Sequence, residues 1–403
     1  MLNVACCLFI LTYPFSMRIS NLIIVLISVI ALFSNSFKEK KERFLSNRIL
    51  YIYPIYFVLL CLGIFNSEDI PYSFKVLESS LPVLILPFFL GTAAPIQDEA
   101  KKRLLFVVVM SAFLAAGYCL IRNLIFIKMS NLEWRYLFQW EYAHEHLTSY
   151  IGFHPTYFAT FILISIGIIF FSFSWDGGLR KFLNVLACIF FIFFLMLLGA
   201  KIGIVILVLI IIPLGALMVF KNYSRKFGFV LIAFVAGTGI GLYSTPVVYW
   251  RFKSMLDSII WTLNGNGVKS YDYRLFHWMC AWEGIKLKPI AGYGTGDYLH
   301  QLNNCYESIG KQELLNYNSH NQFLDLWLAL GIIGLVISIL LYAIPVYESI
   351  RLRNLLFLTV SVVFFAVSLT ESILWTQKGI ALFSFFVALF FGQFNKPDRL
   401  KEA

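Results

Sequence analysis

Long apolar runs recur along the whole sequence, and they constrain the fold more than any other feature. Most approach twenty residues, the length at which an α-helix crosses the hydrocarbon core of a bilayer. With 60% hydrophobic and 13% charged residues among 403, the chain has too little polar surface for a soluble globule. We therefore predict an all-α, polytopic integral membrane protein with about twelve transmembrane helices. The predicted spans are residues 3–17, 21–37, 49–65, 77–94, 104–127, 156–175, 182–200, 202–220, 227–243, 321–344, 355–374 and 379–394.

Basic residues predict the orientation of these spans. Lysine and arginine gather in every second connection and in the tail, so the positive-inside rule places both termini in the cytoplasm. The basic segments are 38–48, 101–103, 180–181, 221–226, 351–353 and 396–401. Because loops facing an anionic leaflet explain the net charge of +10, we predict a lipid bilayer as partner and no nucleic acid.

Two outward connections are long, from about residue 128 to 155 and from about 244 to 320, and loops of such length usually carry function. All the histidines lie in them or at their edges: His144, His146, His154, His277, His300 and His320. We therefore expect the chemistry on the outward face. The predicted architecture is a single bundle, residues 1–403, in which residues 244–320 form a lid over an outward-facing groove.

The larger loop contains an amphipathic pattern followed by a glycine-rich segment. Apolar positions recur at helical spacing and predict a helix along the outer interface: Leu275, Trp278, Met279, Trp282 and Ile285. Its aromatic residues suit either interfacial anchoring or sugar stacking. No strand precedes Gly292, Gly294 and Gly296, so they are no nucleotide fingerprint. Two interpretations stay open: a turn that needs permissive backbone, or bare amides that face a phosphate.

The segment SHNQ, residues 319–322, ends this loop before an apolar run. Ser319 followed by Gln322 matches a capping box, which predicts Ser319 as N-cap and His320 in the first helical turn. The unpaired amides of a helix N-terminus attract phosphate and disfavour a protonated imidazole. A neutral His320 could accept a proton, and the plain alternative is a histidine merely hydrogen-bonded at a helix end.

The acidic residues and the remaining histidines offer little for a metal site. His144 and His146 flank Glu145, but two histidines without a third ligand form a weak site, and no DxD motif occurs, so we predict no metal and no cofactor. Glu371 stands at the outer end of a span, where a carboxylate is either functional or locked to Lys378 or Arg274.

The cysteines show no CxxC spacing. Cys280 and Cys305 stand in the polar outward loop, where an oxidising compartment would permit a disulfide. Because spacing alone does not establish contact, we predict that they are not bonded.

The order of these features resembles the O-antigen ligase and polymerase superfamily of bacterial envelope enzymes. The resemblance is most specific across about residues 201–335, through "YDYRLFHWMCAWEGIKLKPIAGYGTG" (271–296) and "SHNQFLDLWLALGIIGL" (319–335). In that family an arginine on the long outward loop and a histidine at its end are needed for activity, and they map onto Arg274 and His320. "LLGAKIGIV" (197–205) places Lys201 where the family usually has arginine, which keeps the charge but loses the two-pronged donor. "GFHPTYFATF" (152–161) adds His154 as a weaker candidate.

The resemblance implies a GT-C-like membrane glycosyltransferase. Such enzymes take a glycan from undecaprenyl, or another polyprenyl, diphosphate and join it to a sugar hydroxyl of lipid A-core. The reaction inverts the sugar, needs no metal, and takes place on the periplasmic face of the bacterial inner membrane. Predicted contacts to the diphosphate or substrate are Lys201, Arg251, His154, Asn321 and Glu371, with Arg274 and His320 as catalytic residues. His320 would be the base toward the acceptor hydroxyl or a donor that orients the diphosphate.

Two other functions remain as alternatives. A polymerase would use the same fold and leaving group but extend a carrier-linked glycan. A non-enzymatic glycolipid transporter would show similar internal halves and ionisable residues spread through the midplane, and the sequence shows little of either. The single long loop late in the chain favours the ligase.

Overall fold

The computed structural model describes residues 1–175, 177–215, 246–264 and 273–394. These residues form helices joined by short loops, and no strand occurs among them. The α-helices are α1 Leu2–Thr12, α2 Met17–Leu32, α3 Phe37–Ser46, α4 Ile52–Gly63, α5 Ile70–Thr92, α6 Asp98–Met129, α7 His144–Ser149, α8 Pro155–Ser172, α9 Gly178–Leu198, α10 Lys201–Ile206, α13 Pro246–Leu263, α14 Tyr273–Leu287, α15 Tyr298–Ser308, α16 Gln322–Arg351, α17 Leu355–Ser368 and α18 Gln377–Val387. An all-α fold was predicted and is confirmed for the described residues.

Six described helices are long and apolar enough to cross a membrane: the α4 segment, α5, α6, α8, α9 and α16. The pair α2 and α3, bent by 106°, would make a seventh span. Shorter apolar helices cover α1, residues 201–215, α17 and residues 377–393. The apolar run at 227–243 lies outside the described residues, so a count of about twelve stays a prediction. The protein is nevertheless a polytopic membrane protein.

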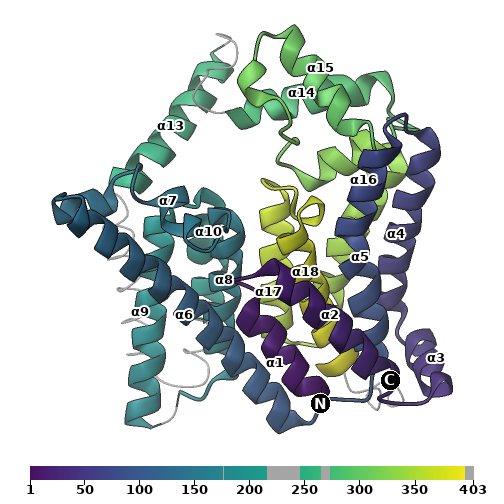
Figure 1. Ribbon diagram of the computed structural model, residues 1–403, viewed down its shortest axis with the longest axis vertical. Helices are drawn as coiled ribbons and strands as arrows, with labels where there is room; N and C mark the ends of the chain where they lie inside the picture. Colours follow the sequence, from purple (N-terminus) through teal and green to yellow (C-terminus); the bar gives the residue numbers. More distant parts are fainter. Residues whose placement is uncertain (176, 216–245, 265–272, 395–403) are drawn as a thin grey trace.

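Helix α8 forms the centre of the molecule. Of its apolar window 89% is buried inside the protein, whereas the other candidate spans bury between 39% and 50% of theirs. A helix that is apolar on every side is expected to be enclosed by other helices. Here α8 packs against α6, α9, α10 and α17, and a Cβ at Gly167 would lie 3.0 Å from Thr359 of α17. Figure 1 shows α6 and α9 on one side of α8, and α4, α5 and α16 on the other.

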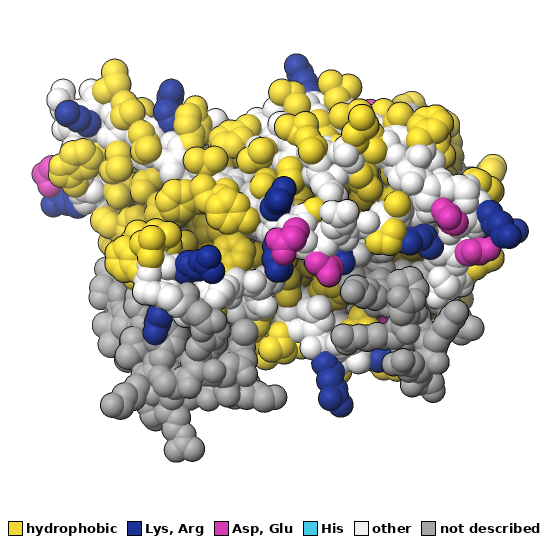
Figure 2. Space-filling view, turned by 90° about the horizontal axis from the view of Figure 1, so that it is seen from below, with side chains coloured by type: hydrophobic (Ala, Val, Ile, Leu, Met, Phe, Trp, Pro, Cys, Tyr) yellow, Lys and Arg dark blue, Asp and Glu magenta, His cyan; other side chains and the backbone are white. Residues whose placement is uncertain are grey.

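The two ends of the molecule differ in chemistry. In Figure 1 the N-terminus and α3 lie at the bottom, whereas α13, α14 and α15 lie at the top. Figure 2, seen from below, shows lysine and arginine side chains on the described part of this face and no histidine. The lysine and arginine side chains of this face therefore lie at the end of the molecule opposite α14 and α15, which carry His277 and His300.

Helix α16 contains a sharp break at Gly331, which adopts φ 66° and ψ −155°. The break frees carbonyls that a neighbouring loop then binds: Tyr293 N donates to Leu328 O at 2.9 Å, and Gly294 N donates to Ala329 O at 2.8 Å. A Cβ at Gly331 would lie 1.8 Å from Ile290 O, so only glycine permits this approach.

The glycine-rich segment before α15 is thereby explained. Besides the contacts to α16, Thr295 N donates to Gly63 O at 3.2 Å and Gly296 N to Ser67 Oγ at 2.9 Å. Gly294 adopts φ 94°, which favours glycine. The hypothesis that these amides face a phosphate is wrong, because the protein itself occupies them. The permissive turn is the correct interpretation.

Candidate functional site

A cavity of about 1360 Å³ is lined by residues of the connection before α8, of α13 and α14, and of the segment before α16. Its walls carry lysine, arginine and histidine together with carboxylates and aromatic rings. The residues that line it include Trp140, Glu141, His144, Glu145, His154, Thr156, Lys201, Trp250, Lys253, Asp257, Tyr273, Arg274, His277, Glu313, Tyr317, His320 and Glu371. The cavity therefore collects most of the candidate residues that the sequence indicated, on segments far apart in the chain.

Glu371 joins the two residues for which a catalytic role was predicted. Its side chain is 2% exposed, and each carboxylate oxygen has a different partner. Oε1 accepts from Arg274 Nη2 at 2.6 Å and from Thr156 Oγ1 at 3.4 Å, whereas Oε2 lies 3.0 Å from His320 Nδ1. Of the two partners proposed for Glu371, Arg274 is therefore found, and Lys378 instead donates to Gly152 O.

The Glu371 carboxyl lies outside the membrane-spanning helices and is ionised. Burial alone would raise its pKa, but the hydrogen bond and charge of His320 and the charge of Arg274 together lower the pKa to about 2. A carboxylate only accepts hydrogen bonds, so His320 must carry its proton on Nδ1. The lone pair of a neutral His320 ring then lies on Nε2, and the ring lines the cavity.

His320 precedes α16 in a backbone conformation that is rare for residues other than glycine. Its φ is 50°, and its amide donates to Asn318 Oδ1 at 3.1 Å. The N-cap of α16 is Asn321, whose Oδ1 accepts from Phe323 N at 3.0 Å and Leu324 N at 3.2 Å. The predicted capping box with Ser319 as N-cap is therefore wrong, and His320 lies before the helix. Because the Asn321 cap occupies those amides, they do not offer the phosphate site that we expected.

A second buried carboxylate fixes the two segments that carry His320 and Glu371. Asp325 is fully buried, and its Oδ1 accepts from Ser319 N at 3.0 Å while Oδ2 accepts from the Ser372 hydroxyl. Gln322 Oε1 accepts from Leu374 N at 2.7 Å. Sequence reasoning missed Asp325, although an acidic residue in an apolar helix was a usable signal.

The remaining candidates fall into three groups. Lys201 begins α10 and lines the cavity, and His154 lines it from the N-cap position of α8. Asn321 Nδ2 donates to Leu369 O at 3.1 Å, so both ends of this amide are held by the protein. Arg251 belongs to α13, and its side chain lies outside the described residues.

The histidines of the first outward loop bind separate partners. His144 Nδ1 lies 2.6 Å from Leu198 O, and its ring stacks on Trp140. His146 Nδ1 lies 3.1 Å from Asn123 Oδ1. Within the described residues, no group of three or more histidine, cysteine or acidic side chains is arranged to hold a metal ion.

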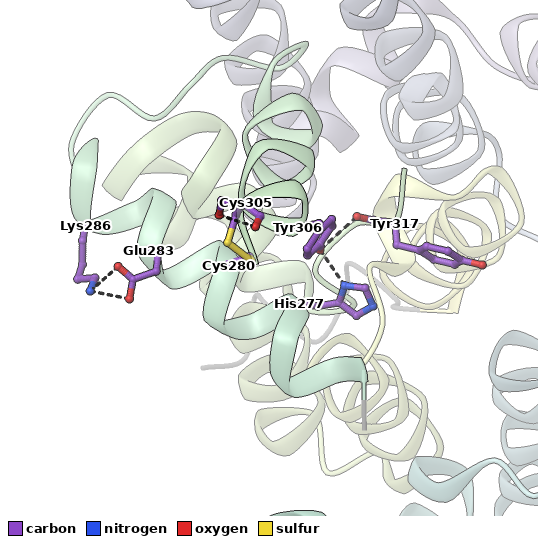
Figure 3. Close-up of a disulfide and its surroundings, with 8 residues drawn as sticks. His277, Cys280, Glu283, Lys286, Cys305, Tyr306 and Tyr317 are labelled. Carbon is purple, nitrogen blue, oxygen red and sulfur yellow. Dashed lines mark hydrogen bonds and ion pairs between the residues drawn. A yellow bond between two sulfur atoms is a disulfide. The ribbon is translucent and has the colours of Figure 1, made fainter. Parts of the chain in front are cut away.

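Cys280 and Cys305 form a disulfide that joins α14 to α15, with Cα atoms 5.6 Å apart. The prediction that they are not bonded is wrong. Sequence spacing could not reveal the packing of α14 beside α15 that brings the two residues together. Figure 3 shows the bond one turn from His277, a cavity residue that sequence reasoning did not select. Its position three residues after Arg274 on a helix was the available signal.

The chain is similar in sequence to known proteins. The family model described as O-antigen ligase matches residues 186–339, a segment that contains Lys201, Arg274 and His320. The chain is 24% identical to the O-antigen ligase of Salmonella typhimurium over 347 residues, which cover 82% of this chain and 78% of that protein. It is 28% identical to the ComP-specific O-oligosaccharyltransferase of Acinetobacter baylyi over 368 residues, which cover 86% of this chain and 61% of that protein. Together with the apolar helices, these similarities support the O-antigen ligase superfamily and indicate a membrane enzyme of the glycosyltransferase type.

Proposed function

We propose that this protein transfers a glycan from undecaprenyl, or another polyprenyl, diphosphate to a sugar hydroxyl of lipid A-core. The reaction takes place on the periplasmic face of a bacterial inner membrane. One observation carries the proposal: an ionised, buried Glu371 holds both Arg274 and His320 at the wall of a large cavity. A base and a cation are the two groups that such a transfer needs.

The proposed step is a single displacement. The acceptor oxygen attacks the anomeric carbon, the bond from that carbon to the diphosphate oxygen breaks, and the sugar inverts. The hydroxyl proton passes to His320 Nε2, while Nδ1–H continues to donate to Glu371 Oε2. The bond to Glu371 orients the imidazole and stabilises the imidazolium that forms. The electron pair leaves with the polyprenyl diphosphate.

Fixed cations would stabilise the departing diphosphate. The Arg274 side chain is 25% exposed, lines the cavity and binds Glu371 through Nη2, one of the nitrogens of a guanidinium that carries five N–H donors. Lys201 lines the same cavity from the start of α10. Positive charges that are already in place when negative charge develops lower the barrier without reorganisation. We assign His154 and Arg251 as further substrate contacts that await a test, and we withdraw Asn321, whose side-chain amide is bonded to the protein at both ends.

The identity of the acceptor separates the proposal from its alternatives. A polymerase would transfer the glycan to a second carrier-linked unit. An oligosaccharyltransferase that modifies a protein, as the name of the Acinetobacter relative says of that protein, would use a side-chain hydroxyl. All three reactions share the donor and the leaving group, so the site residues would keep their roles.

The decisive experiment is transfer in vitro with purified protein, an undecaprenyl-diphosphate glycan, lipid A-core and EDTA. We expect the wild type to form the lipid A-core product in the presence of chelator. His320→Ala should lose about 10²-fold or more of the activity, because general-base catalysis typically contributes that much. His300→Ala is the matched control, since His300 is exposed and is not among the residues that line the cavity.

Each other outcome has a defined meaning. Product that extends the carrier-linked glycan, with lipid A-core unused, would replace the ligase with the polymerase. Loss of activity in EDTA, restored by a divalent cation, would refute the metal-independent mechanism. An unchanged rate for His320→Ala would refute the role of His320 as the base.

A further inference from the structure

His277 is a second histidine at the site, and the displacement described above does not use it. Its side chain is 3% exposed, and it lines the cavity with its ring centroid 5.1 Å from that of His320. It lies on α14 between Arg274, which binds Glu371, and Cys280, which forms the disulfide. The position of His277 therefore depends on the two contacts that fix α14, the ion pair of Arg274 and the disulfide of Cys280.

A short hydrogen-bond chain fixes the His277 ring. His277 Nδ1 lies 2.7 Å from the Tyr306 hydroxyl, and that hydroxyl donates to Tyr317 O at 3.4 Å. A phenol has one proton, so when it serves the carbonyl, His277 must donate from Nδ1. Tyr317 in turn stacks on His320, with ring centroids 6.0 Å apart and an interplanar angle of 29°. His277 thus contacts His320 directly and through Tyr306 and Tyr317.

The charge of His277 is fixed as well. Burial first, and then the positive charges of His320 and Arg274, lower the pKa of His277 to about 3. The ring is consequently neutral at any pH at which the enzyme would work. His320 therefore has a neutral ring beside it, and this neighbour adds no repulsion when His320 takes up a proton.

The disulfide lies next to the contact between His277 and Tyr306. Cys280 follows His277 by one helical turn, and Cys305 directly precedes Tyr306, so the covalent bond joins the two helices at the point where the hydrogen bond forms (Figure 3). While the disulfide is intact, α14 cannot move away from α15. The hydrogen bond alone, worth about 1 kcal/mol, would not enforce this contact.

We propose that His277 is a positioning residue that holds the His320 ring against Glu371, and that the Cys280–Cys305 disulfide keeps His277 in place through Tyr306. This inference rests on the proposed function of His320. If this is correct, glycan transfer depends on the oxidised disulfide, and this dependence acts through the His277 side chain.

A double-mutant cycle tests this chain of contacts. Wild type and His277→Ala are assayed with undecaprenyl-diphosphate glycan and lipid A-core, each with the disulfide intact and after treatment with dithiothreitol. The dithiol becomes a cyclic disulfide as it converts Cys280 and Cys305 to thiols. Cys305 is partly exposed, and the Cys280→Ala/Cys305→Ala double variant supplies the same state without reductant.

We expect reduction to lower kcat of the wild type about tenfold while the KM for donor changes less than twofold, because only the orientation of the base is lost. His277→Ala should start about tenfold lower, and reduction should then change it less than twofold. His277→Asn, whose amide can replace Nδ1 toward Tyr306, should restore most of the rate. His300→Ala, on α15 but outside the cavity, should respond to reduction as the wild type does.

Several results would overturn the inference. A reduced wild type with unchanged kcat would show that the disulfide has no influence on the site. Equal losses on reduction in wild type and His277→Ala would show that the disulfide acts on the fold as a whole. If His277→Ala does not fold, His277→Leu, which fills the space but cannot bond to Tyr306, takes its place in the cycle.

A second measurement does not require turnover. Diethylpyrocarbonate modifies accessible neutral imidazoles, and mass spectrometry locates the modified residue. We expect His277 to be protected while the disulfide is intact and modified after reduction. Equal protection in both states would refute the structural part of the inference. An inactive oxidised wild type that still shows this protection would instead count against the proposed function alone.

Discussion

Replacement of Glu371 by glutamine tests the centre of the site, because this one carboxylate binds Arg274 and His320 through its two oxygens. Glutamine has the same shape but only one acceptor, so its NH₂ group must face either Arg274 or the Nδ1–H of His320. The NH₂ group then either opposes Arg274 Nη2, which is also a donor, or donates to His320 Nδ1 and moves the imidazole proton to Nε2, where the ring can no longer accept the acceptor's proton. We expect kcat/KM to fall about 10²- to 10⁴-fold, which corresponds to about 3 to 5 kcal/mol of transition-state stabilisation.

The same substitution should also lower the stability of the folded protein, by an amount that follows from the pKa of Glu371. In the folded protein, burial raises the pKa of Glu371 but His320 and Arg274 overcome it, and the pKa falls from 4.5 to about 2. This difference corresponds to about 3 kcal/mol that favours the folded state at neutral pH. Because the folded-state pKa is lowered, the stabilisation is present above about pH 5 and is lost as the pH falls toward 2. Wild type and Glu371→Gln should therefore differ most at pH 7 and converge in acid.

The measurements are initial transfer rates and unfolding midpoints in detergent between pH 7 and pH 3. Glu283→Gln is the matched control, because Glu283 pairs with Lys286 on the surface of α14 with its side chain 55% exposed. Such a pair contributes at most about 1 kcal/mol, so the control should keep both rate and midpoint. A Glu371→Gln protein that retains kcat/KM within threefold of the wild type would refute the role assigned to the carboxylate.

Two further predictions concern Arg274 and the break in α16. Arg274→Lys keeps the charge but loses the planar guanidinium with its two parallel donors. We therefore expect steady-state transfer assays to show a KM for the donor raised about tenfold or more and a lower kcat. Unchanged constants would show that a point charge suffices. Gly331→Ala should destabilise the protein by several kcal/mol, because its Cβ would lie 1.8 Å from Ile290 O. Gly310→Ala is the control with a similar φ of 68° but open space around it, and should cost about 1 kcal/mol in the same thermal unfolding assay; equal losses would mean that the close approach is unimportant.

Much of the helical fold could be predicted because apolar length and helix formation coincide in a membrane. The runs that became α5, α6, α9 and α16 were each identified to within a few residues at one or both ends. The break at Gly331 could not be predicted, since a single glycine in an apolar run is common in membrane helices. Only the close approach of residues 290–294 to Gly331 distinguishes this glycine from the others in apolar runs.

The site was predicted in its parts but not in its connections. Arg274 and His320 came from the resemblance, and Glu371 from its position at the end of a span, yet no pattern showed that Glu371 binds both. The N-cap was misassigned because Ser319 and Asn321 are both good caps. The choice is made by Asp325 and Glu371, which bind Ser319 N and His320 Nδ1 from within the fold. Long-range contacts of this kind leave no local signal in one sequence.

The break in α16 at Gly331 also bears on how the protein is made. A helix that enters lipid with unpaired carbonyls at Leu328 and Ala329 would be several kcal/mol less stable there than one whose carbonyls are bonded. The amides that bind these carbonyls belong to Tyr293 and Gly294, which leave the ribosome before α16 does. The donors at Tyr293 and Gly294 are therefore synthesised first. The carbonyls of Leu328 and Ala329 gain their hydrogen bonds only when α16 packs against this segment. A chain that stalls before α16 is inserted would therefore leave the amides of Tyr293 and Gly294 without these carbonyl partners.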